Sequence, residues 1–576
     1  MAQGFLNDSL AASGEDLDIV GDEYFNNLVM HSFFQEVDKD SKGRIEFCEM
    51  HDLIHDFAKS LVENECFTLT IKDTNAQEFN FSRARHLYLL IEEISVIPSF
   101  VYKAKNLRTL KIYGHIPNVS SELFCELTCL RTLDLGNTYL EELSNEIEKL
   151  IHLRYLNLSQ ARFKELPETL TRLYNLQVLQ LYACRNLYKL PEGIGGLVNL
   201  IDLGLLECHQ LSHLPEGIGK LTRLRGLSDF IIGGVERGGW KIGELKNLNF
   251  LKGSLRIISL ERVKNGNEAK MACLKDKQKK EKEEDEDGGC ARKRCKQLPS
   301  TLGKLPFLET LVIAEMYKVK FMGVEFFAID DAIRSDNGVD TIFPKLKVFQ
   351  IDGMWNLKEW DMRVQEKYGK EFSFMPCLEY LSLIVLPKLR SFPQHLTQSL
   401  SLKKLFIWYC PKLNWMPSPS SHLPFLHFEE LILKWDAGSF SKSLVANNHM
   451  FFPKLRLLSV RKSPYSSLPE GLGNLTSLET LDIRTCSKIK SIPEKELRHL
   501  TTLKELTIVR CPALRRRCKK DIGEDWSKIF HIPKIFIDGD MIKQGTASTT
   551  TGHGGKKSEQ DATHHILKSK HNMLNF

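Results

Sequence analysis

The sequence predicts an α/β solenoid, that is, a curved parallel sheet built from stacked repeats with an irregular or short helical convex side. The first observation is a phrase of spaced leucines, L-x-x-L-x-L, which recurs through most of the 576 residues. In one stretch it begins at Leu130, Leu153, Leu176 and Leu200, so these repeats start 23 or 24 residues apart. That is the period of leucine-rich repeats. One such unit cannot bury its apolar face alone, so the units stack.

Two further observations support the solenoid. Within each phrase, apolar and variable residues alternate, which predicts a short parallel strand with every second side chain facing the core. A Leu-Pro pair often follows, as at Leu166-Pro167 and Leu190-Pro191. Because proline disfavours continued pairing, it is expected to end the strand and start the convex segment.

Five cysteines share one position of the repeat: Cys184, Cys208, Cys410, Cys486 and Cys511. In leucine-rich repeats this position holds a buried Asn or Cys that supports the turn after the strand. These thiols are therefore predicted to be structural, and unpaired in a reducing compartment.

Residues 1–66 are predicted to form part of a winged-helix domain. Apolar residues around Tyr24 and Leu28 indicate one helix, and residues 50–61 carry apolar side chains at helical spacing for a second. The polar stretch between them predicts two short strands joined by a turn. Helix, hairpin and helix together make a partial winged-helix arrangement.

The solenoid itself is expected over residues 83–540, opening with a weak repeat around Leu87. Residues 226–296 lose the leucine period and include the run KDKQKKEKEEDEDGG. Such a mixed-charge run predicts an irregular, solvated insert. Residues 541–576 are of low complexity, which predicts a disordered tail.

Composition narrows the class of protein. The net charge is only +6, from 79 Lys+Arg and 73 Asp+Glu, which gives no indication of a nucleic-acid partner. The N-terminus lacks the basic start and apolar run of a signal peptide, and no apolar stretch approaches the roughly 20 residues of a membrane span. The 14 cysteines contain no C-x-x-C pair. We expect a cytoplasmic protein without a membrane span.

Two local patterns resemble metal sites. Residues 38–49 match several positions of a calcium loop, but Lys42 stands where a ligand oxygen is required. His51 and His55 have the spacing of a zinc-protease helix, with Asp52 in place of Glu and no third ligand evident. A winged-helix hairpin and helix account better for both, so neither a metal nor a catalytic residue is predicted.

The variable strand positions point to the concave side, and these are the candidate protein-binding residues. They include Tyr155, Asn157, Gln180, Tyr182, Lys404, Phe406, Trp408, Tyr409, Asp482 and Arg484. Exposed aromatic rings beside charges are typical of protein-interface hot spots, and Phe406-x-Trp408-Tyr409 is the strongest candidate patch. The alternative is that these side chains pack against neighbouring repeats or a lateral loop.

Three phrases carry a resemblance to a known family: residues 21–35 (GDEYFNNLVMHSFFQ), 49–62 (EMHDLIHDFAKSLV) and 511–538 (CPALRRRCKKDIGEDWSKIFHIPKIFID). They resemble the plant nucleotide-binding leucine-rich-repeat disease-resistance proteins of the coiled-coil subclass. That family joins a coiled coil, a P-loop nucleotide-binding domain, a winged helix and the repeats. The present sequence has no G-x-x-x-x-G-K-[ST] phrase and starts inside the winged helix. We therefore expect a truncated member without the coiled coil and P-loop domain.

The resemblance also implies a function in plant innate immunity. The family's Met-His-Asp phrase contacts bound ADP and corresponds here to His51 and Asp52, so ADP or ATP is expected only in the full-length family and no cofactor for this chain alone. The family's repeats recognise a pathogen effector or a guarded host protein and restrain the nucleotide-binding domain, and intact resistance receptors are a further partner class. The alternative is a free-standing cytosolic repeat adaptor or decoy. Neither reading is enzymatic.

Overall fold

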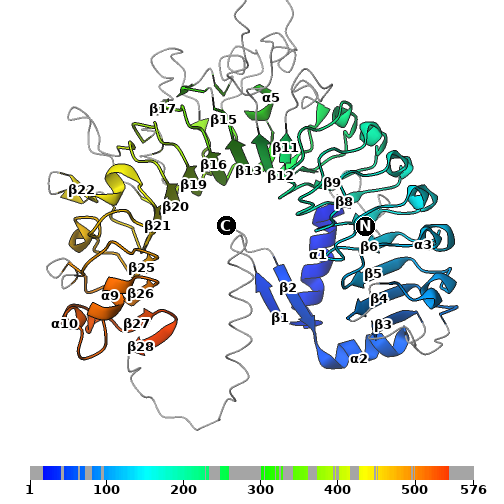
Figure 1. The fold of residues 1–576 in the computed structure, drawn as a ribbon, viewed down its shortest axis with the longest axis horizontal. Helices are drawn as coiled ribbons and strands as arrows, with labels where there is room; N and C mark the ends of the chain where they lie inside the picture. The colour runs from blue at the N-terminus through cyan, green and yellow to red at the C-terminus, as the bar shows by residue number, and fades with distance from the viewer. Residues whose placement is uncertain are drawn as a thin grey trace, which may run out of the picture.

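The computed structural model is an arc of parallel strands, with the sheet on its inner side and short helical segments on its outer side (Figure 1). The predicted leucine-rich-repeat solenoid is thus confirmed. The structure describes residues 17–39, 45–62, 65–71, 81–92, 96–227, 229–231, 247–258, 300–303, 305–317, 319–323, 326–327, 341–360, 373–392, 396, 401–414, 427–446, 449–450, 452–493, 497 and 500–543.

The N-terminal segment is a helix, an antiparallel hairpin and a second helix, in the predicted order. Its elements are α1 (Leu17–Met30), β1 (Phe34–Lys39), β2 (Ile45–Met50) and α2 (Asp52–Leu61). The second helix begins where it does because the Nδ1 atom of His51 accepts a hydrogen bond from the backbone N–H of Leu53, 3.3 Å away, which satisfies one of the unpaired donors of the first turn.

The first sheet has eight parallel strands that follow one another in sequence order. They are β3 (Cys66–Ile71), β4 (His86–Ile91), β5 (Thr109–Tyr113), β6 (Thr132–Asp134), β7 (Tyr155–Asn157), β8 (Val178–Gln180), β9 (Asp202–Gly204) and β10 (Gly226–Leu227). Each pairs in register with the next, so that Leu133, Leu156 and Leu179 lie side by side. We call this half the N-terminal arm.

The second sheet has twelve strands and forms the C-terminal arm. They are β11 (Asp229–Ile231), β12 (Lys252–Ile258), β13 (Phe307–Ala314), β16 (Val348–Asp352), β19 (Tyr380–Ile384), β20 (Lys404–Trp408), β21 (Glu430–Lys434), β24 (Leu457–Arg461), β25 (Thr480–Arg484), β26 (Glu505–Val509), β27 (Lys534–Ile537) and β28 (Asp540–Lys543). All are parallel except β28, which runs antiparallel to β27 and closes the described array. Two-stranded pairs lie outside this sheet: β14 (Phe321–Met322) with β17 (Glu359–Trp360), β15 (Thr341–Ile342) with β18 (Ser373–Phe374), and β22 (Val445–Ala446) with β23 (His449–Met450).

The convex side is made of short helices. They are η1 (Ser99–Lys103), α3 (Ser121–Glu126), η2 (Asn145–Lys149), η3 (Glu168–Arg172), η4 (Glu192–Gly196), η5 (Ile218–Lys220), α5 (Ser300–Gly303), η10 (Gly438–Ser441), η11 (Leu472–Asn474), α9 (Pro512–Arg517) and α10 (Trp526–Ile529). Pro167 and Pro191 stand directly before η3 and η4 with extended backbone, as predicted for the Leu-Pro signature. No helix in the described ranges has both the length and the apolarity needed to cross a bilayer.

Two expected boundaries differ from the structure. The parallel sheet begins at Cys66, not at residue 83, because the alternating phrase CFTLTI pairs with β4 although it lacks the first leucine of the repeat. Part of the expected insert 226–296 is also regular, since β12 lies between β11 and β13. Its apolar residues read Leu251-x-x-x-Leu255-x-Ile257, one residue longer than the repeat phrase, and the strand register shifts next to Gly253. Residues 259–296 and 544–576 lie outside the described residues.

The core is a continuous stack of the repeat leucines, most of them fully buried. The five cysteines at the shared repeat position are buried too, as predicted. The thiol of Cys184 donates to the carbonyl oxygen of Leu158 (3.2 Å), and that of Cys208 to the carbonyl oxygen of Leu181 (3.0 Å). Each thiol therefore ties its repeat to the strand end of the previous repeat. Burial raises the pKa of the Cys410 thiol to about 12, which keeps that group protonated.

Candidate protein-binding surface

Three of the four predicted residues of the N-terminal arm donate hydrogen bonds to carboxylates of neighbouring repeats. Asn157 donates to Asp134 (2.8 Å) and Gln180 donates to Asp202 (2.8 Å). The Tyr182 hydroxyl donates to Glu207 (3.0 Å). Tyr155 is half-buried on β7, and burial raises its pKa. Here the concave side chains form a polar ladder between neighbouring repeats.

The predicted residues of the C-terminal arm belong to a different surface. Strand pairing places Trp408 beside Lys434, Lys434 beside Arg461, and Arg461 beside Arg484. The four side chains stand in one row across β20, β21, β24 and β25, one strand spacing apart, which is about 4.8 Å. Along this row, the indole ring of Trp408 is therefore followed by three adjacent cationic side chains.

A second row lies one residue further along each strand. It contains Tyr409, Trp435 and Lys462, whose φ angles of 55°, 61° and 50° place them in the left-handed region. The backbone hydrogen bonds between neighbouring strands continue into the turn that holds this row, since the Trp435 N–H donates to the Arg461 carbonyl oxygen (2.9 Å). Tyr409 and Trp435 are 38% and 45% exposed, which leaves much of both rings open to a partner.

We call these two rows the aromatic–basic surface. It comprises Trp408, Tyr409, Lys434, Trp435, Arg461, Lys462 and Arg484. The Lys434 ammonium lies 3.7 Å from the centre of the Trp408 ring, a close cation–π contact. Burial lowers the pKa of Lys434, and the nearby charges of Lys462 and Arg461 lower it further. Positive charge is therefore concentrated at this point of the sheet.

Asp482 is the carboxylate within this surface, and it is almost buried, with 6% exposed. It accepts from Arg484 Nε (2.7 Å) and from the Ser459 hydroxyl (2.8 Å), and it lies 3.5 Å from Arg461. Asp482 is one of the candidate protein-binding residues predicted from the sequence. Its burial instead makes it the group that holds the two guanidinium groups in place.

Lys404 and Phe406 lie at the border of the aromatic–basic surface. Lys404 forms an ion pair with Glu430 (2.9 Å) and lies 5.4 Å from the centre of the Tyr380 ring. Phe406 is half-buried between its neighbours on β20.

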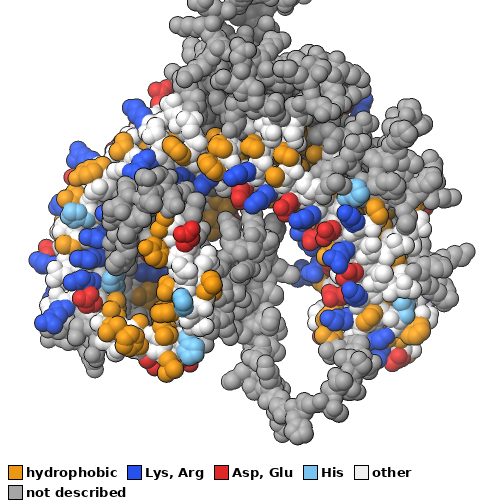
Figure 2. All heavy atoms as spheres, turned by 180° about the vertical axis from the view of Figure 1, so that it is seen from behind, with side chains coloured by type: hydrophobic (Ala, Val, Ile, Leu, Met, Phe, Trp, Pro, Cys, Tyr) orange, Lys and Arg blue, Asp and Glu red, His pale blue; other side chains and the backbone are white. Residues whose placement is uncertain are grey.

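Charges at the edge of the same arm are arranged differently. The residue just before each strand from β16 to β26, together with Glu309 of β13 at the same level, alternates in sign along the ladder: Glu309, Lys347, Glu379, Lys403, Glu429, Arg456, Glu479 and Lys504. Several of these neighbours are ion pairs, including Arg456–Glu479 (3.1 Å) and Lys504–Glu479 (2.9 Å). Figure 2 shows basic and acidic side chains following one another along the inner edge of this arm. The acidic and basic side chains at this edge therefore balance each other's charge. The aromatic–basic surface next to the edge has an excess of positive charge.

Sequence reasoning missed Lys434, Trp435, Arg461 and Lys462. The available signal was the alignment of the repeats on their leucines, which puts these residues in the columns of Trp408 and Tyr409. The two predicted groups are not brought together, because they lie in separate sheets on different arms of the arc (Figure 1).

The residues considered for nucleotide or zinc lie on α2 and at its N-cap. His51 and Asp52 are exposed at its start, and His51 is engaged in capping the helix. Within the described parts of the chain, no three His, Cys, Asp or Glu side chains gather as a metal site would require. Residues 40–44 of the calcium-like phrase lie outside those parts.

Two family models match this chain. Residues 1–58 match a disease resistance protein winged helix domain, and residues 106–279 match a leucine-rich repeat region. Among solved structures, a leucine-rich-repeat protein of Leptospira interrogans aligns with a TM-score of 0.42 and 20% identity, covering 77% of this chain and 93% of that one.

Curated relatives match most of the sequence. Disease resistance protein RGA2 of Solanum bulbocastanum is 31% identical over 93% of this chain and 56% of its own length. Putative disease resistance protein RGA1 of the same species gives 31% identity with the same two coverages. The chain thus spans about half the length of the curated relatives that it matches.

Proposed function

We propose that this chain, which is of the plant disease resistance type with a winged helix and leucine-rich repeats, acts in plant defence as a non-enzymatic protein-recognition module. Its partner is a pathogen-derived protein or a host protein that the pathogen modifies, and recognition takes place in the cytoplasm. The aromatic–basic surface is the part of the chain that makes the contact.

One observation carries this proposal. Exposed tryptophan, tyrosine and arginine side chains are the residues most enriched in the energetic centres of protein interfaces. The exposed Tyr409 and Trp435 and the half-buried Trp408 lie together on neighbouring repeats beside Arg461. A rigid parallel sheet holds them, so little conformational entropy is lost when a partner binds. The excess of positive charge favours a partner with an acidic surface and speeds the encounter.

The N-terminal segment supports a regulatory part of the proposal. Leu53, Phe57 and Leu61 on α2 are 74%, 62% and 70% exposed, although they form one apolar face of that helix. An apolar face of this kind favours a contact with another protein domain. In the full-length family this would be the nucleotide-binding domain, with ADP near His51 and Asp52.

Replacing the central ring tests the proposal. We expect Trp408→Ala to abolish a resistance response mediated by this chain, because truncating a hot-spot aromatic costs about 2 kcal/mol or more of binding free energy, roughly thirtyfold in affinity. The full chain and the variant would be expressed in leaves of a susceptible plant. Multiplication of a panel of pathogen isolates would then be measured.

Trp355→Ala is the control, since Trp355 is a tryptophan that is 49% exposed, more than the half-buried Trp408, and lies outside the aromatic–basic surface. It should leave resistance unchanged. If Trp408→Ala protects leaves as well as the unmodified chain at equal protein level, recognition does not pass through this surface and the proposal is wrong.

A further inference from the structure

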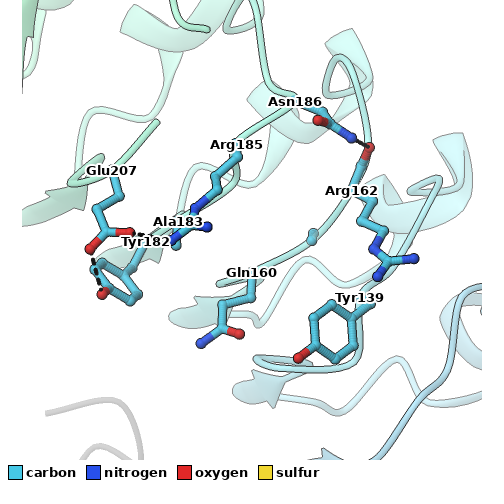
Figure 3. A pocket seen from close by; sticks show the side chains of 9 residues that line it. Tyr139, Gln160, Arg162, Tyr182, Ala183, Arg185, Asn186 and Glu207 are labelled. Atoms are coloured by element: carbon cyan, nitrogen blue, oxygen red, sulfur yellow. Dashed lines mark hydrogen bonds and ion pairs between the residues drawn. The ribbon is translucent and has the colours of Figure 1, made fainter. Parts of the chain in front are cut away.

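A cavity of about 510 Å³ opens among the turns that follow β6, β7, β8 and β9. It is distinct from the aromatic–basic surface and lies on the other arm. Six of its side chains matter for what it can bind: Tyr139, Gln160, Arg162, Tyr182, Arg185 and Glu207 (Figure 3). Gln160, Ala183 and Glu207 occupy the same left-handed turn position in three successive repeats, with φ of 62°, 56° and 65°, so Gln160 and Glu207 stand two repeats apart at equivalent positions.

One side of the cavity is satisfied internally. Glu207 accepts from Arg185 (2.8 Å) and from the Tyr182 hydroxyl (3.0 Å). The hydrogen bond from Arg185 holds the pKa of Glu207 below its usual range. Burial and the bond to Glu207 raise the pKa of Tyr182, so the phenol stays neutral. This carboxylate is ionised and already paired, which leaves it no charge to offer a second cation.

On the other side of the cavity, several side-chain hydrogen-bond donors have no acceptor among the described residues. The Arg162 guanidinium lies 5.0 Å from the centre of the Tyr139 ring, and Arg162 is exposed. Its guanidinium makes no ion pair or hydrogen bond with any described residue, and neither does the Gln160 amide or the Tyr139 hydroxyl. Figure 3 shows the three side chains on one side of the cavity, with Tyr182, Arg185 and Glu207 on the other.

We infer that this cavity binds an acidic side chain of a protein segment. A carboxylate accepts two parallel hydrogen bonds from one guanidinium, and the Tyr139 ring already holds Arg162 in place for that geometry. The Gln160 amide and the Tyr139 hydroxyl are further donors within the same cavity. An anionic occupant is favoured, because the charges lining the cavity sum to a net positive charge once Arg185 and Glu207 have paired. This inference does not depend on the function proposed above.

Binding of blocked peptides to the full chain tests the inference. The probes are fluorescent acetyl-Asp-Glu-Asp-Glu-amide and its uncharged counterpart acetyl-Asn-Gln-Asn-Gln-amide, measured by fluorescence anisotropy. We expect only the acidic peptide to bind. Arg162→Gln should lower the affinity for that peptide by about tenfold, which is the effect of losing one charge-assisted hydrogen-bonded pair. The affinity of Arg162→Lys for the acidic peptide should lie between those of the unmodified chain and Arg162→Gln. Lysine keeps the positive charge but cannot donate two parallel hydrogen bonds to one carboxylate.

Arg172→Gln is the matched control. It removes an exposed arginine of the convex helix η3, where Arg172 pairs with Glu148, and it should leave peptide binding unchanged. Equal binding of the two peptides, or equal affinity of Arg162→Gln and the unmodified chain, would overturn the inference. Inorganic phosphate that displaces the acidic peptide at equal concentration would also overturn it, since the site would then hold a free anion and have no preference for a protein segment.

Discussion

Asp525→Asn is expected to lower the free energy of unfolding of the C-terminal cap, residues 511–543, by about 3 kcal/mol, the lower part of the range for breaking a buried ion pair. The Asp525 side chain is completely buried. It accepts from Arg517 (2.9 and 3.0 Å), from Lys528 (2.7 Å) and from the backbone N–H of Ile492 (3.1 Å). An asparagine would leave two cations beside a neutral amide and weaken the link between the cap and the repeat before it.

The acid stability of the cap follows from the same carboxylate. Burial by itself raises the pKa of Asp525, but hydrogen bonds from Arg517 and Lys528 outweigh it and bring the pKa down to about 2. A carboxyl with a lower pKa in the folded than in the unfolded protein stabilises the fold above its unfolded value, about 3.9, and loses that contribution as the pH falls toward 2. The difference between the unmodified chain and Asp525→Asn should therefore shrink between about pH 4 and about pH 2.

Hydrogen exchange of the cap amides measures this prediction directly, because repeats unfold in local units and a global melt would average over them. Asp521→Asn is the control, since Asp521 is an exposed carboxylate in the same cap. If both substitutions leave amide protection in the cap equal at pH 7, the buried cluster does not hold the cap.

The second large effect is expected at Asp482→Asn, about 2 to 3 kcal/mol of unfolding free energy at neutral pH. Asp482 is nearly buried and is shared by Arg484, Arg461 and Ser459. Without its charge, the two guanidinium groups would repel each other and Lys434 in the same row. The substitution should also disorder the side chains of the aromatic–basic surface.

Glu430→Gln gives the comparison for that prediction. Glu430 also pairs with a lysine on the concave side, but it is 41% exposed, and exposed ion pairs contribute about 0 to 1 kcal/mol. Urea unfolding of both variants would separate the two cases. A loss at Asp482→Asn no greater than at Glu430→Gln would mean that Asp482 is not the neutralising centre of the surface.

The leucine phrase was sufficient to predict most of the fold. It placed the strands at Leu133, Leu156 and Leu405 because every unit must bury the same apolar positions. It failed where a strand departs from the phrase, as in β3, which lacks the first leucine, and β12, which carries one residue more. Both strands form nevertheless, because each pairs with a neighbouring strand of its sheet.

The candidate surface could be predicted only in part. Alternation along one strand identified Trp408 and Arg484, since their side chains point outward on any β-strand. It could not distinguish the buried Asp482 from the exposed residues, because burial there depends on arginines of the neighbouring repeats. The cavity around Arg162 gave no signal in the sequence, since it depends on turns in the left-handed region of successive repeats.

A photo-crosslinking amino acid placed at position 408 would show whether a partner binds at the aromatic–basic surface. The full chain would be expressed in leaves, illuminated during infection, and compared with the same substitution at position 355. We expect one pathogen or host protein to crosslink from position 408 and not from position 355. Crosslinks of the same proteins from both positions, or none from position 408 in leaves that resist infection, would contradict recognition by the aromatic–basic surface.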